Sequence, residues 1–225
     1  MEHLRYKNLQ YNRAIPTNFD PAQKYPLIIL FHGAGSRGSD PSGISYSYKM
    51  EAYMQEHNLS AMLVAPLCEY DNWYMCFSEL VDFVRYAAAM DNVDPDRVYL
   101  LGNSMGGYAT WTMLMCVPEL IAAAVPICGG GMAWNTGRMK DVPVWALHGV
   151  DDDVVAVTES IAMANALRRA GGRVTLTLLP GVDHNAWDPA LYEKNCLKED
   201  LQKEISKKDK SFKVVAATKD MYLKL

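Results

Sequence analysis

The chain has 225 residues, of which 50% are hydrophobic and 21% are charged, and its formal net charge is -4 at pH 7. This composition excludes an intrinsically disordered chain, and the length favours one domain over residues 1–225. The small negative charge gives no basic surface for nucleic acid. No apolar run approaches the roughly 20 residues of a membrane span, and residues 1–12 lack the apolar core of a secretory signal. We therefore expect a cytoplasmic protein that does not bind membranes.

Strand and helix patterns alternate along the chain. Helical spacing of apolar residues occurs over residues 80–88, after a candidate cap at Ser78, and over residues 161–168, after Thr158 and Ser160. Strands separated by helices need crossover connections, which predicts an α/β fold with a mostly parallel central sheet, helices on both faces and no large lid domain. Apolar runs predict buried strands at residues 26–31, 61–65, 97–101, 123–127, 142–147 and 174–179.

The end of the chain differs from the rest in composition. Residues 198–225 are rich in lysine, and helical spacing is weak at Leu197, Leu201 and Ile205. Two interpretations remain open for this segment, a final helix and strand packed on the sheet edge or a loosely held tail.

The cysteines favour neither a disulfide framework nor a metal site. Their number is odd and their spacing is not that of metal ligands, so we expect reduced thiols, no metal and no cofactor. Cys68 and Cys76 alone are placed to bridge a loop. The five are Cys68, Cys76, Cys116, Cys128 and Cys196.

The strongest motif follows the third apolar run. The chain passes from that run into Gly102-Asn103-Ser104-Met105-Gly106 and then into a helical segment beginning near Tyr108. Small residues on both sides of the serine allow a sharp turn that exposes its hydroxyl group, and the helix start behind it supplies backbone donors. We therefore predict Ser104 as a nucleophile. The alternative is a glycine-rich turn without a catalytic role.

A serine hydroxyl needs a base, most often histidine, and the imidazole needs a carboxylate behind it. Of the five histidines, only His184 lies beyond the last predicted strand, downstream of Ser104 and of the acidic run 151–153. This is the order Ser, Asp, His that the motif requires, so we predict His184 as the base; the alternative is a surface histidine beside Asp183. The residues alone leave open which member of the run, Asp151, Asp152 or Asp153, is the acid.

Acyl transfer also needs donors directed at the developing oxyanion. The backbone amide of Met105 is one candidate, because it follows the predicted nucleophile. The second is expected from the glycine-rich loop 31–38, with Ala34 preferred and Gly35 next. A phosphate-binding loop is a competing interpretation of these glycines, but the Gly-Lys-Ser/Thr ending is absent.

Three tryptophans lie in loops at the predicted active-site end. Trp73, Trp134 and Trp187 are candidates to line an acyl or alcohol pocket. Burial in the core is the alternative for each of them.

Four segments together carry a resemblance to a known family. They resemble the carboxylesterase and predicted-peptidase branch of the α/β-hydrolases, near feruloyl esterases, polyhydroxybutyrate depolymerases and prolyl oligopeptidase catalytic domains. The resemblance implies an α/β-hydrolase fold, Asp152 as the acid, and Ala34 and Met105 as oxyanion donors. The chain departs from the pattern at Ala156, where relatives commonly carry proline, and in its lysine-rich end. The segments are residues 30–38 with His32-Gly33-Ala34-Gly35, residues 93–108 with Ser104, residues 148–155 with Asp152, and residues 180–188 with His184.

These observations predict a cofactor-free serine esterase that cleaves small esters, with short acyl or small aromatic groups, through an acyl-enzyme. A serine peptidase of the prolyl-oligopeptidase type is the first alternative, but it usually needs an additional domain that recognises the peptide. A non-catalytic binding protein with a hydrolase fold is the second. The complete set of Ser104, Asp152 and His184 argues against it, because binding alone requires no such set.

Overall fold

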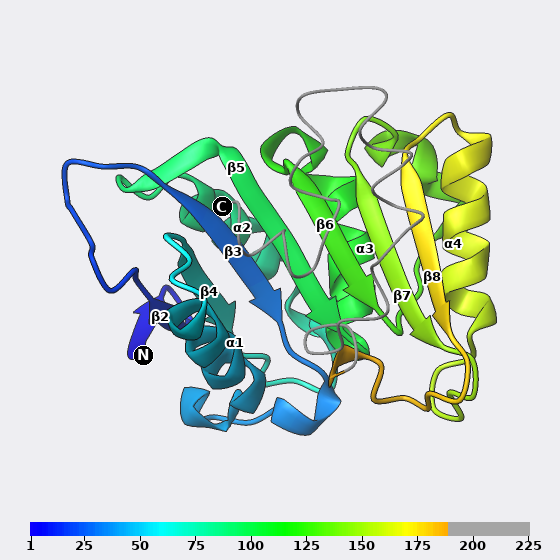
Figure 1. Cartoon of the computed structure of the whole chain (residues 1–225), viewed down its shortest axis with the longest axis horizontal. Helices are drawn as coiled ribbons and strands as arrows, with labels where there is room; N and C mark the ends of the chain where they lie inside the picture. The colour runs from blue at the N-terminus through cyan, green and yellow to red at the C-terminus, as the bar shows by residue number, and fades with distance from the viewer. Residues whose placement is uncertain (189–225) are drawn as a thin grey trace.

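The computed structural model describes residues 1–188, so the segment 198–225 and Cys196 lie outside the described residues. The described residues form an eight-stranded sheet with helices packed against it (Figure 1). The strands are β1 (Glu2–Tyr6), β2 (Leu9–Ala14), β3 (Tyr25–Phe31), β4 (Met62–Pro66), β5 (Val93–Asn103), β6 (Ala123–Ile127), β7 (Val144–Gly149) and β8 (Val174–Leu179).

The sheet order is β1-β2-β4-β3-β5-β6-β7-β8. The pairs β1–β2 and β2–β4 are antiparallel, and every other neighbouring pair is parallel. The six predicted strands correspond to β3 through β8, which confirms the mostly parallel sheet. β5 begins four residues before the apolar run 97–101. Its first residues, which include Asp94 and Asp96, are polar and partly exposed, so the search for apolar runs missed them.

Within residues 1–188, four α-helices connect or flank these strands: α1 (Ser45–Glu56), α2 (Phe77–Ala88), α3 (Met105–Cys116) and α4 (Thr158–Arg169). The cap predicted at Ser78 is wrong, because α2 already begins at Phe77 and Ser78 lies in its first turn. α3 begins directly after Ser104, earlier than the predicted start near Tyr108. Short 3-10 turns occupy Ala34–Ser36, Pro41–Gly43, Trp73–Cys76, Pro118–Leu120 and Ala133–Met139.

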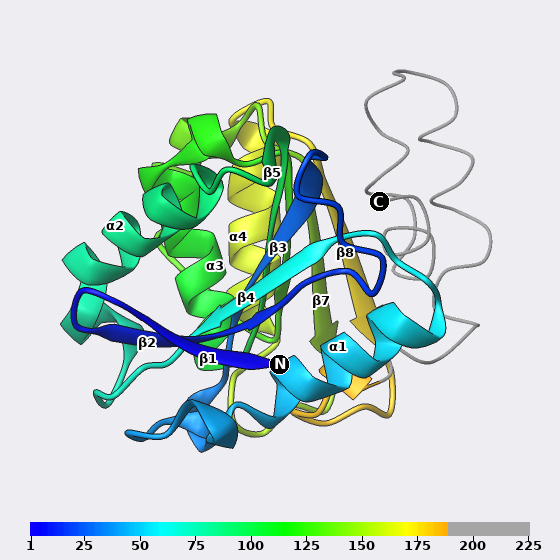
Figure 2. The same cartoon turned by 90° about the vertical axis from the view of Figure 1, so that its left-hand side faces the viewer.

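Both faces of the sheet are covered. Alternate residues of β3 belong to different core clusters: Leu27, Ile29 and Phe31 pack with α2, α3 and α4, whereas Ile28 and Leu30 pack with α1. All seven residues of β3 are therefore buried, as in a central parallel strand. Figure 2 shows α1 on one side of the sheet and the other three helices on the opposite side. The expectation of helices on both faces is confirmed.

The parallel strands end along one edge of the sheet, and this arrangement positions the loops considered below. Phe31, Asn103, Ile127, Gly149 and Leu179 are the last residues of β3, β5, β6, β7 and β8. In open α/β sheets, ligands bind in the crevice beyond these carboxyl ends. Within residues 1–188, every helix is too short or too polar to cross a membrane.

Candidate active site

Ser104 occupies a sharp turn between β5 and α3. Its backbone has φ 56° and ψ −121°, a conformation that is rare for residues other than glycine and costs of order 1–3 kcal/mol. The turn is possible because the residues two positions before and after Ser104 are glycines. A Cβ at Gly106 would clash with the backbone carbonyl of Phe31 in β3, and a Cβ at Gly102 would clash with the carbonyl of Gly106. The strand, turn and helix therefore hold the Ser104 side chain above the end of the sheet.

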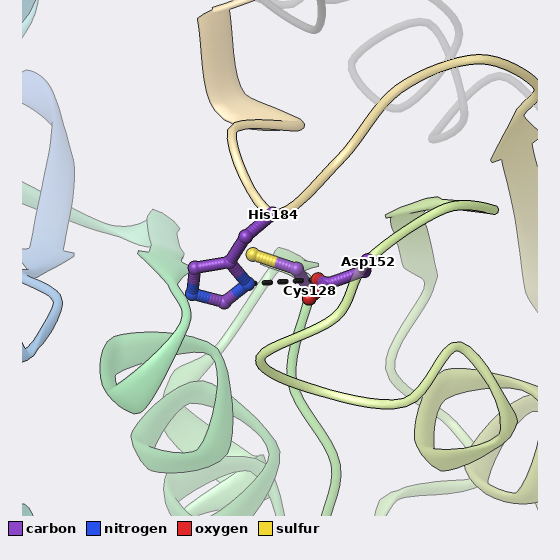
Figure 3. A group of neighbouring side chains, drawn as sticks. All are labelled: Cys128, Asp152 and His184. Atoms are coloured by element: carbon purple, nitrogen blue, oxygen red, sulfur yellow. Dashed lines mark hydrogen bonds and ion pairs between the residues drawn. The ribbon is translucent and has the colours of Figure 1, made fainter.

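Ser104, His184 and Asp152 form one chain of hydrogen bonds. His184 Nε2 lies 2.8 Å from Ser104 Oγ, and His184 Nδ1 lies 2.8 Å from Asp152 Oδ2. Figure 3 shows the second of these contacts, with the two side chains coming from different loops. Because an ionised carboxylate only accepts, Nδ1 carries the proton and Nε2 is free to accept from the serine. The structure thus brings together the three residues predicted as nucleophile, base and acid.

The carboxylate of Asp152 is buried and fully engaged. Its Oδ1 accepts hydrogen bonds from the backbone N–H groups of Val154 and Val155, at 2.9 and 2.8 Å. Burial alone would raise the pKa of Asp152, but the hydrogen bonds from His184 and from these two amides outweigh it and hold the pKa below its usual value. Asp151 and Asp153 are exposed. Asp152 is therefore the member of the acidic run that contacts His184.

Two buried residues that were not predicted as site residues, His148 and Ser160, lie behind Asp152. His148 Nε2 lies 3.2 Å from Asp152 Oδ2 and 2.9 Å from the carbonyl oxygen of Val155. Its other ring nitrogen is 2.7 Å from Ser160 Oγ at the start of α4. A histidine before a glycine at the end of a strand gives no signal of this role, because its partners are known only once the loop has folded.

The loops carrying Asp152 and His184 are joined to each other. The N–H of Val150 donates to the carbonyl of Leu179, and the N–H of Asp151 donates to that of Val182, each at 3.0 Å. Gly149 permits this close approach, because a Cβ there would clash with the Val182 and Asp183 carbonyls. The loop that carries Asp152 and the loop that carries His184 therefore form one unit at the ends of β7 and β8.

The glycine-rich loop after β3 lies beside the nucleophile turn. A Cβ placed on Gly33 would be 3.5 Å from Ser104 Cβ, so this backbone passes close to the serine. Ala34 and Met105 each stand first in a helical turn, where the N–H group has no carbonyl partner from its own helix. The two residues predicted as oxyanion donors thus lie on segments next to Ser104.

The side chain of His32 stabilises this loop through hydrogen bonds at both ring nitrogens. The N–H of Cys68 donates to His32 Nε2 at 2.9 Å, which leaves Nδ1 as the protonated nitrogen that donates to the Gly33 carbonyl at 2.7 Å. Burial lowers the pKa of His32 to about 4, so the ring is neutral at pH 7. The indole N–H of Trp73 donates to the His32 carbonyl at 3.2 Å.

Comparison with known proteins gives the family. The model of the dienelactone hydrolase family matches residues 51–214. The chain belongs to this family. Its fold agrees with that assignment, because a thermostable esterase of known structure superposes with a TM-score of 0.72 at 31% identity, over 84% of this chain and 59% of that one.

Curated relatives of this dienelactone hydrolase family member include two fungal proteins. A probable feruloyl esterase C of Aspergillus terreus is 26% identical and covers 72% of this chain. Feruloyl esterase D of Neurospora crassa is 25% identical and covers 74%. The matched region spans 62% and 59% of the lengths of these two relatives.

The three tryptophans have different surroundings in this family member. Trp73 is 3% exposed and its indole N–H donates to the His32 carbonyl, so its side chain packs beneath the glycine-rich loop after β3. Trp187 packs edge to face against His184, with ring centroids 5.4 Å apart. Trp134 is 82% exposed in the turn Ala133–Met139. Only Trp187 directly contacts a member of the hydrogen-bond chain.

Cys128 is a further neighbour of these groups that sequence reasoning missed. It directly follows β6, is fully buried, and has φ 40°. Burial raises the pKa of its thiol to about 12, although the backbone N–H of Ser104 donates to the sulfur. In Figure 3 the sulfur lies beside the contact between His184 and Asp152. The residue was missed because nothing in its local sequence links it to either of those loops.

Proposed function

We propose that the protein is a carboxylic-ester hydrolase in which Ser104 is the nucleophile, His184 the general base and Asp152 the acid. The observation that carries the proposal is the pair of 2.8 Å hydrogen bonds joining Ser104 Oγ, His184 and Asp152 Oδ2. Such a chain gives the hydroxyl a base within reach of its proton and gives the base a carboxylate partner. Similarity to esterases in sequence and in fold supports an ester as the substrate.

In the first half of the reaction, Ser104 Oγ attacks the ester carbonyl while His184 Nε2 accepts the hydroxyl proton. The imidazolium that forms is stabilised by Asp152, whose lowered pKa keeps it ionised at neutral pH. The amides of Ala34 and Met105 donate to the oxyanion, a contribution of about 2.7–4 kcal/mol for one such donor in a serine hydrolase. His184 then returns the proton to the departing alcohol, and the acyl group stays on Ser104.

In the second half, water replaces the alcohol. His184 removes a proton from water as the water attacks the acyl carbonyl, and the same amides hold the second oxyanion. Return of the proton to Ser104 Oγ releases the carboxylic acid. No step draws on a group other than these side chains, the two amides and water.

We further propose that the acyl group is short or that the ester carries a small aromatic group. Between the described strands lie single helices and short 3-10 turns, and none of these is long enough to cover a deep acyl tunnel. Trp187 beside His184 offers an aromatic face close to the reacting groups. The resemblance to feruloyl esterases is in keeping with such a substrate.

The test compares the parent with Ser104→Ala on p-nitrophenyl butyrate, methyl ferulate and a proline-containing peptide amide. The parent is expected to hydrolyse at least one of the two esters, to react covalently with a serine-directed phosphonate and to be labelled at Ser104. The variant is expected to keep the folded circular dichroism spectrum while losing hydrolysis and labelling.

Two results would overturn the proposal. Labelling at a serine other than Ser104 would remove the nucleophile assignment, and preferential cleavage of the peptide amide would assign a peptidase instead. A matched control is Ser78→Ala: this serine is exposed in the first turn of α2, so phosphonate labelling at Ser104 should survive.

A further inference from the structure

Three side chains with metal-binding atoms meet beside the nucleophile. The sulfur of Cys128, a carboxylate oxygen of Asp152 and a ring nitrogen of His184 all lie within 4.8 Å of one another. Figure 3 shows them converging from three separate loops. In the part of the chain that the structure describes, this is the one such group of three.

A tetrahedral zinc site requires small movements of these three ligand atoms. Zinc bonds of about 2.3 Å to sulfur and about 2.0–2.1 Å to nitrogen or oxygen place neighbouring ligand atoms roughly 3.3–3.6 Å apart. The sulfur lies within 4.8 Å of the other two ligand atoms and must approach them by up to about 1.3 Å, whereas the 2.8 Å contact between His184 and Asp152 must open by about 0.5 Å. His184 is the group with room to move, because its side chain is 19% exposed and that of Asp152 is fully buried.

We propose that Cys128, Asp152 and His184 form a binding site for a thiophilic divalent cation, such as Zn²⁺ or Cd²⁺, and that the bound ion inhibits hydrolysis. Thiolate and imidazole ligands select such ions over Mg²⁺ and Ca²⁺, which prefer oxygen. Three protein ligands leave a fourth position for water. The binding half of the proposal depends on these three side chains alone, and the inhibition half rests on the function proposed above.

Inhibition follows from the protons that the ion displaces. The Cys128 thiol loses its proton to solvent when sulfur binds the ion, since a coordinating thiol is deprotonated. The proton on His184 Nδ1 must also leave that nitrogen, and the ring then carries it on Nε2. In this tautomer Nε2 donates to Ser104 Oγ instead of accepting from it. The serine has lost its base, while Asp152 keeps its bonds to Val154 and Val155.

The experiment titrates the purified full chain with CdCl₂ and records two quantities. One is the ultraviolet charge-transfer absorption of a cadmium–thiolate bond, and the other is the rate of p-nitrophenyl butyrate hydrolysis. We expect the absorption to saturate near one equivalent and the rate to fall in parallel, with MgCl₂ and CaCl₂ without effect. Cys128→Ser should abolish that absorption and raise the half-inhibitory cadmium concentration by at least about 100-fold, since even outer partners of metal ligands contribute 10–100-fold.

Matched variants separate this site from other thiols and from folding defects. Cys116→Ser changes a half-buried cysteine at the far end of α3 and should behave as the parent does. Cys128→Ala is the second variant at the site, in case the serine hydroxyl disturbs the buried carboxylate. Cadmium absorption and inhibition that survive in both folded Cys128 variants would place the ion elsewhere, for example at Cys68 and Cys76, and would overturn the proposal.

Ser104→Ala distinguishes failure of this inference from failure of the proposed function. That variant retains all three ligands, so it should still bind cadmium with the same absorption while being unable to hydrolyse the ester. Cadmium absorption in a parent that hydrolyses no ester would leave the ion site standing and remove the esterase. Ester hydrolysis by a parent that shows no cadmium absorption would leave the proposed esterase function standing and remove the ion site.

Discussion

Replacing Asp152 with asparagine tests the assignment of the acid most directly. Asparagine has nearly the same shape as aspartate, but its side-chain amide has one oxygen that accepts and one NH₂ group that donates, whereas both carboxylate oxygens accept. The oxygen side is required by the N–H groups of Val154 and Val155, which now donate to Oδ1. The NH₂ group is therefore turned toward His184 Nδ1, which lies 2.8 Å from Oδ2 in the parent. A flip of the amide would set NH₂ against two backbone donors, so the structure opposes it.

The consequence is a fixed but wrong tautomer of His184. An NH₂ group donates, so Nδ1 must accept and the ring proton moves to Nε2. A protonated Nε2 cannot accept the proton of the Ser104 hydroxyl group. For a triad of this kind, Asp to Asn lowers kcat about 10,000-fold, which corresponds to about 5 kcal/mol in the barrier. Asp152→Asn should show this loss in kcat for p-nitrophenyl butyrate while thermal unfolding stays cooperative.

The control variants are Asp151→Asn and Asp153→Asn. Both side chains are exposed, and exposed charges contribute little, so kcat should stay within about tenfold of the parent. If Asp153→Asn causes the large loss of kcat and Asp152→Asn leaves kcat nearly unchanged, the acid has been misassigned and the tautomer argument fails.

Three further predictions concern pH, packing and substrate length. Burial lowers the pKa of His32 from 6.5 in the unfolded chain to about 4 in the folded protein, so between pH 7 and pH 4 the unfolded state takes up more protons than the folded state. The free energy of unfolding, measured in urea, should fall by about 3 kcal/mol over this pH range because of His32, and His32→Asn should reduce this dependence on pH. The same pH dependence in parent and variant would contradict a buried neutral ring. Gly106→Ala should lower the melting temperature or prevent soluble expression, because its Cβ meets the Phe31 carbonyl; a parent-like melting curve would refute the close packing. Hydrolysis of p-nitrophenyl esters should fall from butyrate to laurate, and a maximum at laurate would mean that a covered acyl tunnel exists.

Sequence patterns predicted the centre of the sheet well because its strands are buried on both faces. β3, with every residue buried, reads as one continuous apolar run. β1 is different, since it lies at the sheet edge with mostly exposed residues and is paired only on one side. Such a strand has no apolar run to detect, and neither β1 nor β2 was predicted with boundaries.

The same distinction applies to the candidate site. Ser104 was predictable because its backbone strain demands glycines at fixed positions beside it, which is a local requirement. Cys128 and His148 have no such local requirement; their proximity to Asp152 depends on the register of β6, β7 and β8. The tryptophans show a further limit, because a loop position near the site is compatible with burial, as at Trp73, and with exposure, as at Trp134.

The hydrogen bonds that join the loops after β7 and β8 imply how the protein would lose activity on partial opening. Among the described strands, β8 forms the sheet edge opposite β1, and hydrogen bonds from Val150 and Asp151 join the end of β8 and its loop to the loop after β7. Fluctuations that release an edge strand need less free energy than global unfolding. Release of β8 would withdraw His184 and disturb Asp152 together, whereas Ser104 would remain in its turn between β5 and α3. Hydrogen exchange of the β8 amides would then report the fraction of molecules in which β8 has opened while the turn at Ser104 remains folded. These molecules would be inactive.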